Sequence, residues 1–217
     1  MVENIESPGE VYKGSFDMTC EIVEAQAVMA EGFIGPRAYE LYFKTDLSYG
    51  EEESSIVPYN VETLQKYRQT HLLIYLPQIS IMDIWEKQPG LFYYHEKPWY
   101  SEEKFANLKQ ENGWWLVRKD PVPDSFSKTW FEQLELLEPD EIVPPATLLV
   151  HTLILHWMER GEKLFGEAYG RCRDLDLGGR RVRVGWFNDS GLHIDAGSNK
   201  YSHNSFGLAS VLQPLSD

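Results

Sequence analysis

Cysteine is scarce in this sequence, and its scarcity excludes two classes of protein. The 217 residues include only two cysteines, Cys20 and Cys172. Two are too few for the disulfide framework of a small secreted domain or for a four-cysteine zinc site. Each lies in a strand-like stretch, and cysteines outside disulfides are usually buried. We therefore expect two buried thiols.

Long hydrophobic runs and targeting signals are also missing. The N-terminal segment MVENIESPGE is acidic and polar, whereas a signal peptide needs a basic start followed by an apolar stretch. The longest apolar segment, Val143–Met158, is interrupted by His and Thr. It is also too short for a membrane helix, which needs about 20 residues. These absences predict a cytoplasmic protein that does not bind membranes.

Short motifs of nucleotide binding and catalysis are absent as well. The chain contains no G-x-x-x-x-G-K-[ST] loop, no dinucleotide-binding glycine pattern, no H-E-x-x-H and no nucleophile elbow. We therefore expect no cofactor and no metal site. The motifs alone leave it uncertain whether the protein is an enzyme.

Basic residues are outnumbered by acidic ones. Lys and Arg total 20 against 34 Asp and Glu, which gives a net charge of −14. An acidic surface repels phosphate backbones, so direct nucleic-acid binding is not expected. The imbalance lies upstream, because residues 1–166 hold 28 acidic and 14 basic side chains, whereas residues 167–217 hold six of each.

The most prominent feature that is present is the apolar segment Val143–Met158. At 100° per residue its apolar side chains form one stripe that extends onto both flanks. Pro144 and Pro145 suit a first helical turn, and Arg160 followed by Gly161 suits a helix end. The pattern predicts a buried central helix over about 143–160.

Past this helix, three short strand-like runs alternate with turn-forming sequences. They are Ala168–Arg173, Arg181–Phe187 and Leu192–Asp195. We expect an α+β fold in which a mostly antiparallel sheet packs around the central helix and ends in a C-terminal β-meander. Residues 1–15 are predicted to form a loose arm, and residues 16–217 a single domain with a candidate subdivision near residue 120.

Upstream elements are predicted from shorter patterns. The apolar pattern indicates strands at Phe16–Ile22, Tyr39–Phe43 and Leu91–Tyr94. A short helix is expected at Val61–Arg68. Ser80 and Asp83 have the spacing of a capping box, which indicates a helix start.

Four segments of the C-terminal half carry a resemblance. They are GWWLVRKDPVPDS, KTWFEQLELL, GEKLFGEAYGRCRDLD and RVRVGWFNDSGL, between Trp114 and Leu192 and their immediate neighbours. These segments resemble hypothetical proteins, of no assigned activity, from bacterial genomes of the candidate phyla. The resemblance implies a bacterial source and assigns no chemistry to any residue.

Arginine is concentrated in the predicted meander. Five of the nine arginines lie within thirteen residues: Arg171, Arg173, Arg180, Arg181 and Arg183. Alternation places Arg171 with Arg173, and Arg181 with Arg183, while Val182, Val184 and Trp186 point the other way. If the two pairs meet, Arg171, Arg173, Arg181 and Arg183 form an anion clamp. The alternative is a solvated face whose arginines pair with the protein's own carboxylates.

Histidines are the second group of candidate residues. His151 and His156 are five residues apart, so a helix cannot present both to one metal ion. His156 is a candidate acid–base residue, as is His193 in the meander. A histidine satisfied inside or at the rim of the core is the simpler interpretation of His156. Adjacent aromatic pairs such as Tyr93-Tyr94 should expose one member each and could mark an interface.

Three functions fit these features. We expect first a non-enzymatic binding or protein-interaction module, whose recognition surface is the meander or the exposed aromatic residues. The alternative is a hydrolase or transferase acting on a small phosphorylated substrate, with the four arginines as clamp and His156 or His193 as the acid–base residue. The third is an acidic mimic of nucleic acid. The expected partners are therefore a protein or a small anionic ligand, and neither nucleic acid nor a membrane.

Overall fold

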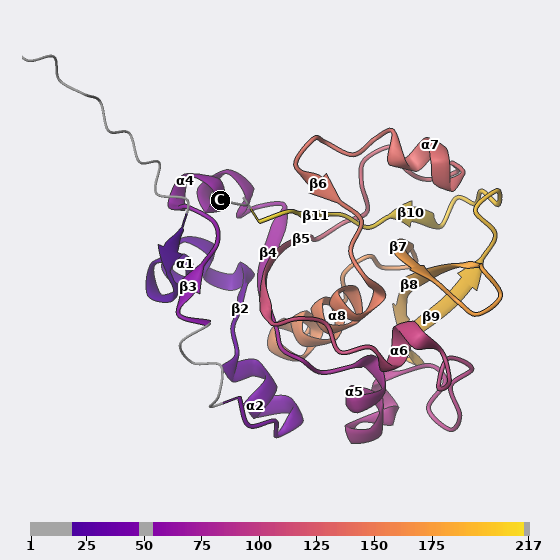
Figure 1. The fold of residues 1–217 in the computed structure, drawn as a ribbon, viewed down its shortest axis with the longest axis horizontal. Coiled ribbons are helices and arrows are strands. Elements are labelled where there is room, and N and C mark those ends of the chain that lie inside the picture. The colour runs from indigo at the N-terminus through magenta and orange to yellow at the C-terminus, as the bar shows by residue number, and fades with distance from the viewer. Residues whose placement is uncertain (1–18, 48–53, 215–217) are drawn as a thin grey trace, which may run out of the picture.

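Two sheets enclose one long helix in the computed structural model, which describes residues 19–47 and 54–214. The helix, α8 (Ala146–Arg160), lies between a five-stranded and a four-stranded sheet (Figure 1). Every residue from Ala146 to His156 is buried. The predicted α+β fold around a buried central helix is therefore confirmed. The helix begins at Ala146 because Pro145 is extended, so Val143 and Pro144 precede it.

The five-stranded sheet has the order β2-β4-β5-β11-β6. Its strands are β2 (Phe33–Ile34), β4 (His71–Leu76), β5 (Gly113–Arg118), β11 (Val211–Leu212) and β6 (Glu141–Ile142). Strand β4 is buried on both faces: Leu72 and Ile74 join the cluster around α8, while Leu73 and Tyr75 join a second cluster. Helices α1 (Ile22–Met29) and α4 (Val61–Tyr67) supply that second cluster. This double burial explains the dense apolar run of β4.

The four-stranded sheet has the order β10-β7-β8-β9. Strands β7 (Tyr169–Leu175), β8 (Arg181–Asn188) and β9 (Gly191–Gly197) are antiparallel neighbours, which confirms the predicted meander. Strand β10 (Phe206–Leu208) adds to β7 in parallel. Val182, Val184 and Ile194 are fully buried in the cluster that contains α8. The opposite, outer face of this sheet carries the arginines.

Shorter elements complete the described chain. They are β1 (Cys20–Glu21), β3 (Ile56–Val57), α2 (Arg37–Phe43), α5 (Ile81–Lys87), α6 (Lys104–Asn107), α7 (Trp130–Leu134) and the 3-10 turns Ala30–Gly32 and Pro89–Leu91. The capping box before α5 is confirmed, because Ser80 Oγ accepts from Asp83 N at 3.1 Å and Ser80 N donates to Asp83 Oδ2 at 2.8 Å. Cys20 and Cys172 are both buried and form no disulfide, as expected.

Of the predicted upstream strands, Phe16–Ile22 is confirmed only in part and Tyr39–Phe43 is wrong. Only Cys20–Glu21 is a strand, and a helix begins at Ile22; Phe16 and Met18 lie outside the described residues, as does the arm 1–15. The Tyr39–Phe43 segment is part of α2. Tyr39 and Phe43 are buried and four residues apart, while Leu41 is 55% exposed. Tyr39 and Phe43 share one helical face while Leu41 lies on the opposite one, so only two of the three alternating positions are buried, as a helix requires.

The predicted strand Leu91–Tyr94 is also wrong. Leu91 closes a 3-10 turn, and only Phe92 forms a bridge, with Leu192 at the edge of β9. Tyr93 N donates to Leu192 O at 3.0 Å, after which the chain leaves the sheet. A proline and a glycine at positions 89 and 90 favour a turn over a continuous strand.

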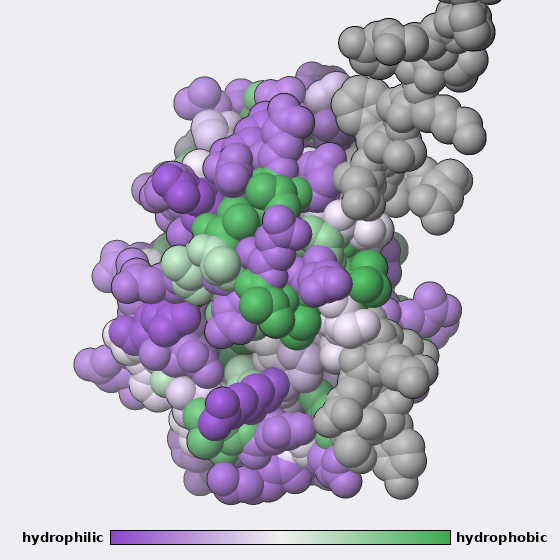
Figure 2. Space-filling view, turned by 90° about the vertical axis from the view of Figure 1, so that its left-hand side faces the viewer, coloured by the Kyte–Doolittle hydropathy of each residue, from purple (hydrophilic) through white to green (hydrophobic). Residues whose placement is uncertain are grey.

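The outer sides of the helices on the five-stranded sheet are partly apolar. Figure 2 shows a patch of hydrophobic side chains, surrounded by hydrophilic ones, on the face formed by α1, α2 and α4. Val23 on α1 is 72% exposed, and Leu41 on α2 is 55% exposed. In the described ranges, none of the helices combines the length and the hydropathy that crossing a bilayer requires.

Candidate functional site

The register of β7 and β8 brings arginines together on the outer face of the four-stranded sheet. Arg171 faces Arg183 directly across the strand pair, and Arg181 precedes Arg183 by two residues on β8. Arg171 is only 1% exposed. Burial and then the charges of Arg183 and Arg181 lower the pKa of Arg171 to about 10, so it remains charged at neutral pH. We call Arg171, Arg181 and Arg183 the arginine layer.

Oxygen atoms of the chain itself hold Arg171. Its Nη1 donates to Lys128 O at 3.0 Å and to Gln133 Oε1 at 2.8 Å, and its Nη2 donates to Tyr201 O. These acceptors lie on the segments that cover the outer face, beside α7 and β10. Among the described residues Arg171 has no carboxylate partner. Arg171 therefore ties the covering segments to the sheet.

The other two members of the layer lie against aromatic rings. Arg183 forms an ion pair with Asp195, and its guanidinium lies 3.9 Å from the ring centre of Phe206. Arg181 lies 3.9 Å from the ring centre of Trp130 and donates through Nε to Asn199 Oδ1 at 3.2 Å. Such stacking stabilises a guanidinium while leaving part of its hydrogen-bonding edge unused.

The fourth predicted clamp residue is separated from the layer. The Arg173 side chain is exposed, and its Nη2 lies 3.4 Å from Gln110 Oε1. The outer face thus brings together three of the four predicted arginines, and the chain's own groups occupy many of their donors. The anion clamp stays a prediction.

One side chain of β8 does not follow the predicted alternation. Val182 and Val184 point into the core as expected, but the Trp186 ring lies 5.9 Å from that of Tyr169. Phe187 instead packs against Trp157 of α8, at 5.3 Å. The register shifts between Gly185 and Asn188, and Trp186 has a φ of 46°. This β-bulge reverses the facing of the residues after Gly185.

The two predicted acid–base histidines occupy different sites. The His193 ring stacks on Tyr93, with ring centres 4.0 Å apart and planes 22° apart. Burial lowers the pKa of His193, and the charge of Asp195 opposes this shift. His156 lies near the end of α8, where its Nε2 is 3.4 Å from Glu162 Oε2. His193 is therefore the histidine that neighbours the arginine layer, through Tyr169.

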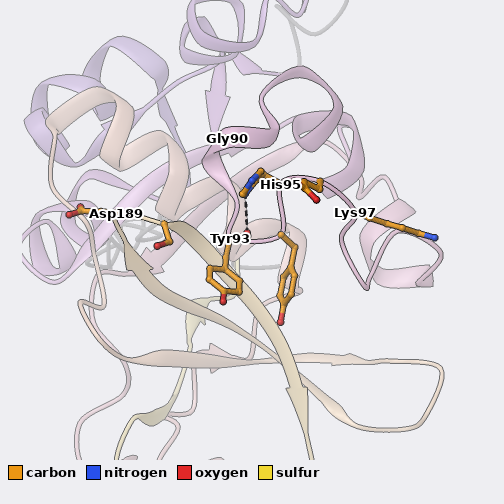
Figure 3. Close-up of a pocket in the computed structure, with 8 residues that line it drawn as sticks. Gly90, Tyr93, His95, Lys97 and Asp189 are labelled. Atoms are coloured by element: carbon orange, nitrogen blue, oxygen red, sulfur yellow. Dashed lines mark hydrogen bonds between the residues drawn. The ribbon is translucent and has the colours of Figure 1, made fainter.

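A hollow of about 820 Å³ opens beside Tyr93, whose ring stacks on His193 (Figure 3). We call it the tyrosine hollow; it is lined by Gly90, Tyr93, Tyr94, His95, Glu96, Lys97, Asp189 and Ser190. Both tyrosines are exposed, Tyr93 by 43% and Tyr94 by 37%. Only one was expected to be exposed, because a strand would have turned the second one inward. In Figure 3, Lys97 extends away from Tyr93.

The backbone under the two tyrosines is held at several points. Trp85 Nε1 donates to Tyr94 O, and Trp99 Nε1 donates to Ile194 O, both at 2.9 Å. The bridge at Phe92 and the bond from Trp99 fix both ends of the exposed stretch from Tyr93 to Lys97 against β9, and the bond from Trp85 ties Tyr94 to α5. Because the loop is already ordered, binding a partner there would cost little conformational entropy.

Tyr94 lies near negative charge. Partial burial raises the pKa of Tyr94, and the nearby charge of Asp195 raises it further. The same two causes, in the same order, raise the pKa of Tyr169 to about 12. Both phenols are therefore neutral hydrogen-bond donors at physiological pH.

Neither a metal centre nor a similar known protein points to a function. Within residues 19–47 and 54–214, no three His, Cys, Asp or Glu side chains are grouped so that they could hold a metal ion. Comparison with family models, with curated proteins and with solved structures finds no match for this chain.

Proposed function

We propose that this protein is a non-enzymatic binding module that captures a basic segment of a partner protein in the tyrosine hollow. One observation carries the proposal: two adjacent tyrosines are exposed side by side on a loop that the fold holds in place. Tyrosine is enriched at protein interfaces, because its ring is large and rigid and its hydroxyl can form a hydrogen bond.

Charge favours a basic partner. The chain carries a net charge of −14, which attracts cationic segments over long range. Glu96 and Asp189 line the hollow together with Lys97, and Asp189 pairs with Lys163 Nζ at 2.9 Å. Asp195 lies close enough to Tyr94 to raise the pKa of its phenol. Lys and Arg side chains bind favourably over tyrosine rings, by about 0.5 to 2 kcal/mol each.

The two other functions remain predictions with less support. An enzyme with an arginine clamp needs free guanidinium donors beside a histidine, whereas Arg171 donates to three oxygen atoms of the chain. An acidic mimic of nucleic acid is supported by the charge alone.

A titration with short peptides tests the proposal. We expect a peptide of alternating Gly and Arg to perturb backbone amide NMR signals of residues 93–97 and 189–190, and a matched Gly-Glu peptide to perturb none of them. Tyr94→Ala should weaken the Gly-Arg peptide about fivefold to tenfold. Added salt should weaken it as well.

Phe131→Ala is the matched control, because Phe131 is a 61% exposed aromatic residue on α7, outside the hollow. It should leave the peptide affinity unchanged. The proposal would be overturned if the Gly-Glu peptide bound as tightly as the Gly-Arg peptide. It would also be overturned if the Tyr94→Ala variant bound the Gly-Arg peptide with unchanged affinity and the same amide signals shifted.

A further inference from the structure

A second concave site surrounds His156, away from the tyrosine hollow. It is a cleft of about 400 Å³ at the C-terminal end of α8. The segment after β5 and the 3-10 turn Ala30–Gly32, which lies between α1 and β2, close it. Lys119, Arg160 and His156 line it, and Leu164 gives it an apolar wall. The size suits a small molecule, because sites for small ligands begin at about 300 Å³.

The two cations of this cleft have backbone carbonyls as partners, not carboxylates. In the part of the chain that the structure describes, neither Lys119 nor Arg160 forms an ion pair. Arg160 Nε donates to Glu31 O at 3.1 Å, and Lys119 Nζ lies 3.4 Å from Arg68 O. Each cation therefore binds a backbone carbonyl and keeps further N–H groups for another acceptor.

Both cations act on the same imidazole. His156 is 5% exposed, and its burial lowers its pKa; Lys119 and Arg160 lower it further, whereas Glu162 opposes the shift. At neutral pH the ring is uncharged, and its Nε2 lies 3.4 Å from Glu162 Oε2, a carboxylate that accepts its one hydrogen bond. The cleft thus offers two positive groups, Lys119 and Arg160, to a compact oxyanion.

Carboxylates also line the cleft. Glu31, Asp120 and Glu162 contribute to its wall, and the Glu162 side chain is 72% exposed. These charges repel a ligand that is only anionic. A small zwitterion satisfies both sets of groups, because its carboxylate can meet the cations while its ammonium group meets Glu162 or Asp120.

We propose that the His156 cleft binds a small zwitterion of the amino-acid type, with its carboxylate at Lys119 and Arg160. This site is independent of the function proposed for the tyrosine hollow. The His156 imidazole reports on it, since a carboxylate bound beside Lys119 and Arg160 changes the field at the ring.

An NMR titration with three small probes tests this site. Glycine, acetate and methylammonium are added separately at constant ionic strength, and the His156 imidazole signals, assigned with His156→Gln, are followed. We expect glycine to shift them saturably, acetate to bind several times more weakly, and methylammonium to have no effect. Lys119→Met and Arg160→Met should each weaken glycine about tenfold.

Two controls separate this site from general effects. Lys66→Met removes an exposed cation from α4 and should leave glycine binding unchanged. Tyr94→Ala should also leave glycine binding unchanged. A negative result at the His156 cleft can therefore be told apart from a negative result at the tyrosine hollow. Acetate binding as tightly as glycine, no saturable shift, or an undiminished shift in both cation variants would overturn the proposal.

Discussion

Arg118 and Arg171 are both strand arginines with little exposure, yet the two sheets satisfy them in different ways. On the five-stranded sheet, Arg118 donates to Glu141 Oε1 through Nε at 3.1 Å and Nη2 at 2.9 Å, and Ser210 Oγ donates to the same oxygen at 3.0 Å. On the four-stranded sheet, Arg171 has carbonyl and amide oxygens as partners.

The difference shows that local register, and not the total charge, decides which partner a cation meets. The chain has 34 acidic side chains, and the surplus favours carboxylate partners for every arginine. The neighbours of Arg171 across the sheet are Arg183 and Leu208, because those residues hold the paired positions. A long-range excess of negative charge cannot replace a partner that the register does not supply.

The largest effect is expected at the ion pair. Burial alone would raise the pKa of Glu141, but the neighbouring His71, whose Nε2 is 3.9 Å from Oε1, and the hydrogen bonds from Arg118 outweigh it and hold the pKa at about 2. Arg118→Met leaves this carboxylate without its cation, so we expect the free energy of unfolding to fall by about 3 to 5 kcal/mol. Urea denaturation at pH 7 measures it. The double variant with Glu141→Leu should recover part of the loss, and a single-variant loss below about 1 kcal/mol would refute the account.

The second prediction concerns pH. Because the pKa of Glu141 is lowered in the folded protein, its contribution is present above its ordinary pKa of 4.5 and is lost as the pH falls through about 2. We expect the stability gap between the original protein and Arg118→Met to narrow steadily from pH 5 to pH 3. Urea titrations at several pH values measure the gap, and a constant gap would contradict the assignment.

A smaller loss is expected for the arginine without a carboxylate. Arg171→Met removes three hydrogen bonds but also removes a buried charge that lacks a counter-ion, so the free energy of unfolding should fall by about 1 to 3 kcal/mol. Arg173→Met, on the same strand but exposed, should change it by less than about 0.5 kcal/mol. The change in the free energy of unfolding caused by Arg171→Met, and that caused by Arg173→Met, should each be the same at pH 5 and at pH 3. A loss at Arg171 equal to that at Arg118 would remove the contrast between the two sheets.

Long patterns in the sequence predicted the parts of the fold that depend on them. The central helix and the three strands of the meander each extend over several residues, so their periodicity is unambiguous. The capping box at Ser80 was also predictable, since it depends on two residues at a fixed spacing. The outward facing of Arg171, Arg181 and Arg183 follows from simple alternation.

Short patterns failed where burial decided between alternatives. The Tyr39–Phe43 segment fits a strand and a helix equally, and contact between Tyr39 Oη and His151 Nδ1 at 3.0 Å belongs to the helix. The bulge at Trp186 was not predicted, although Gly185 directly before it is a signal for one: its φ is 150°, and a Cβ there would clash with Ala168 O. The adjacent pair Tyr93-Tyr94 is visible in the sequence, but both rings are exposed because the chain leaves the edge of β9 after Phe92.

The cleft around His156 illustrates most clearly what cannot be predicted from the sequence. His156 and Arg160 are one helical turn apart, so their proximity follows from the sequence, whereas Lys119 was missed because it lies 37 residues before His156. The sequence by itself determined which segments are buried, because burial follows from local hydrophobic periodicity. Only the tertiary structure decided which polar groups meet, because those contacts join distant segments through the register of two sheets and the packing of one helix between them.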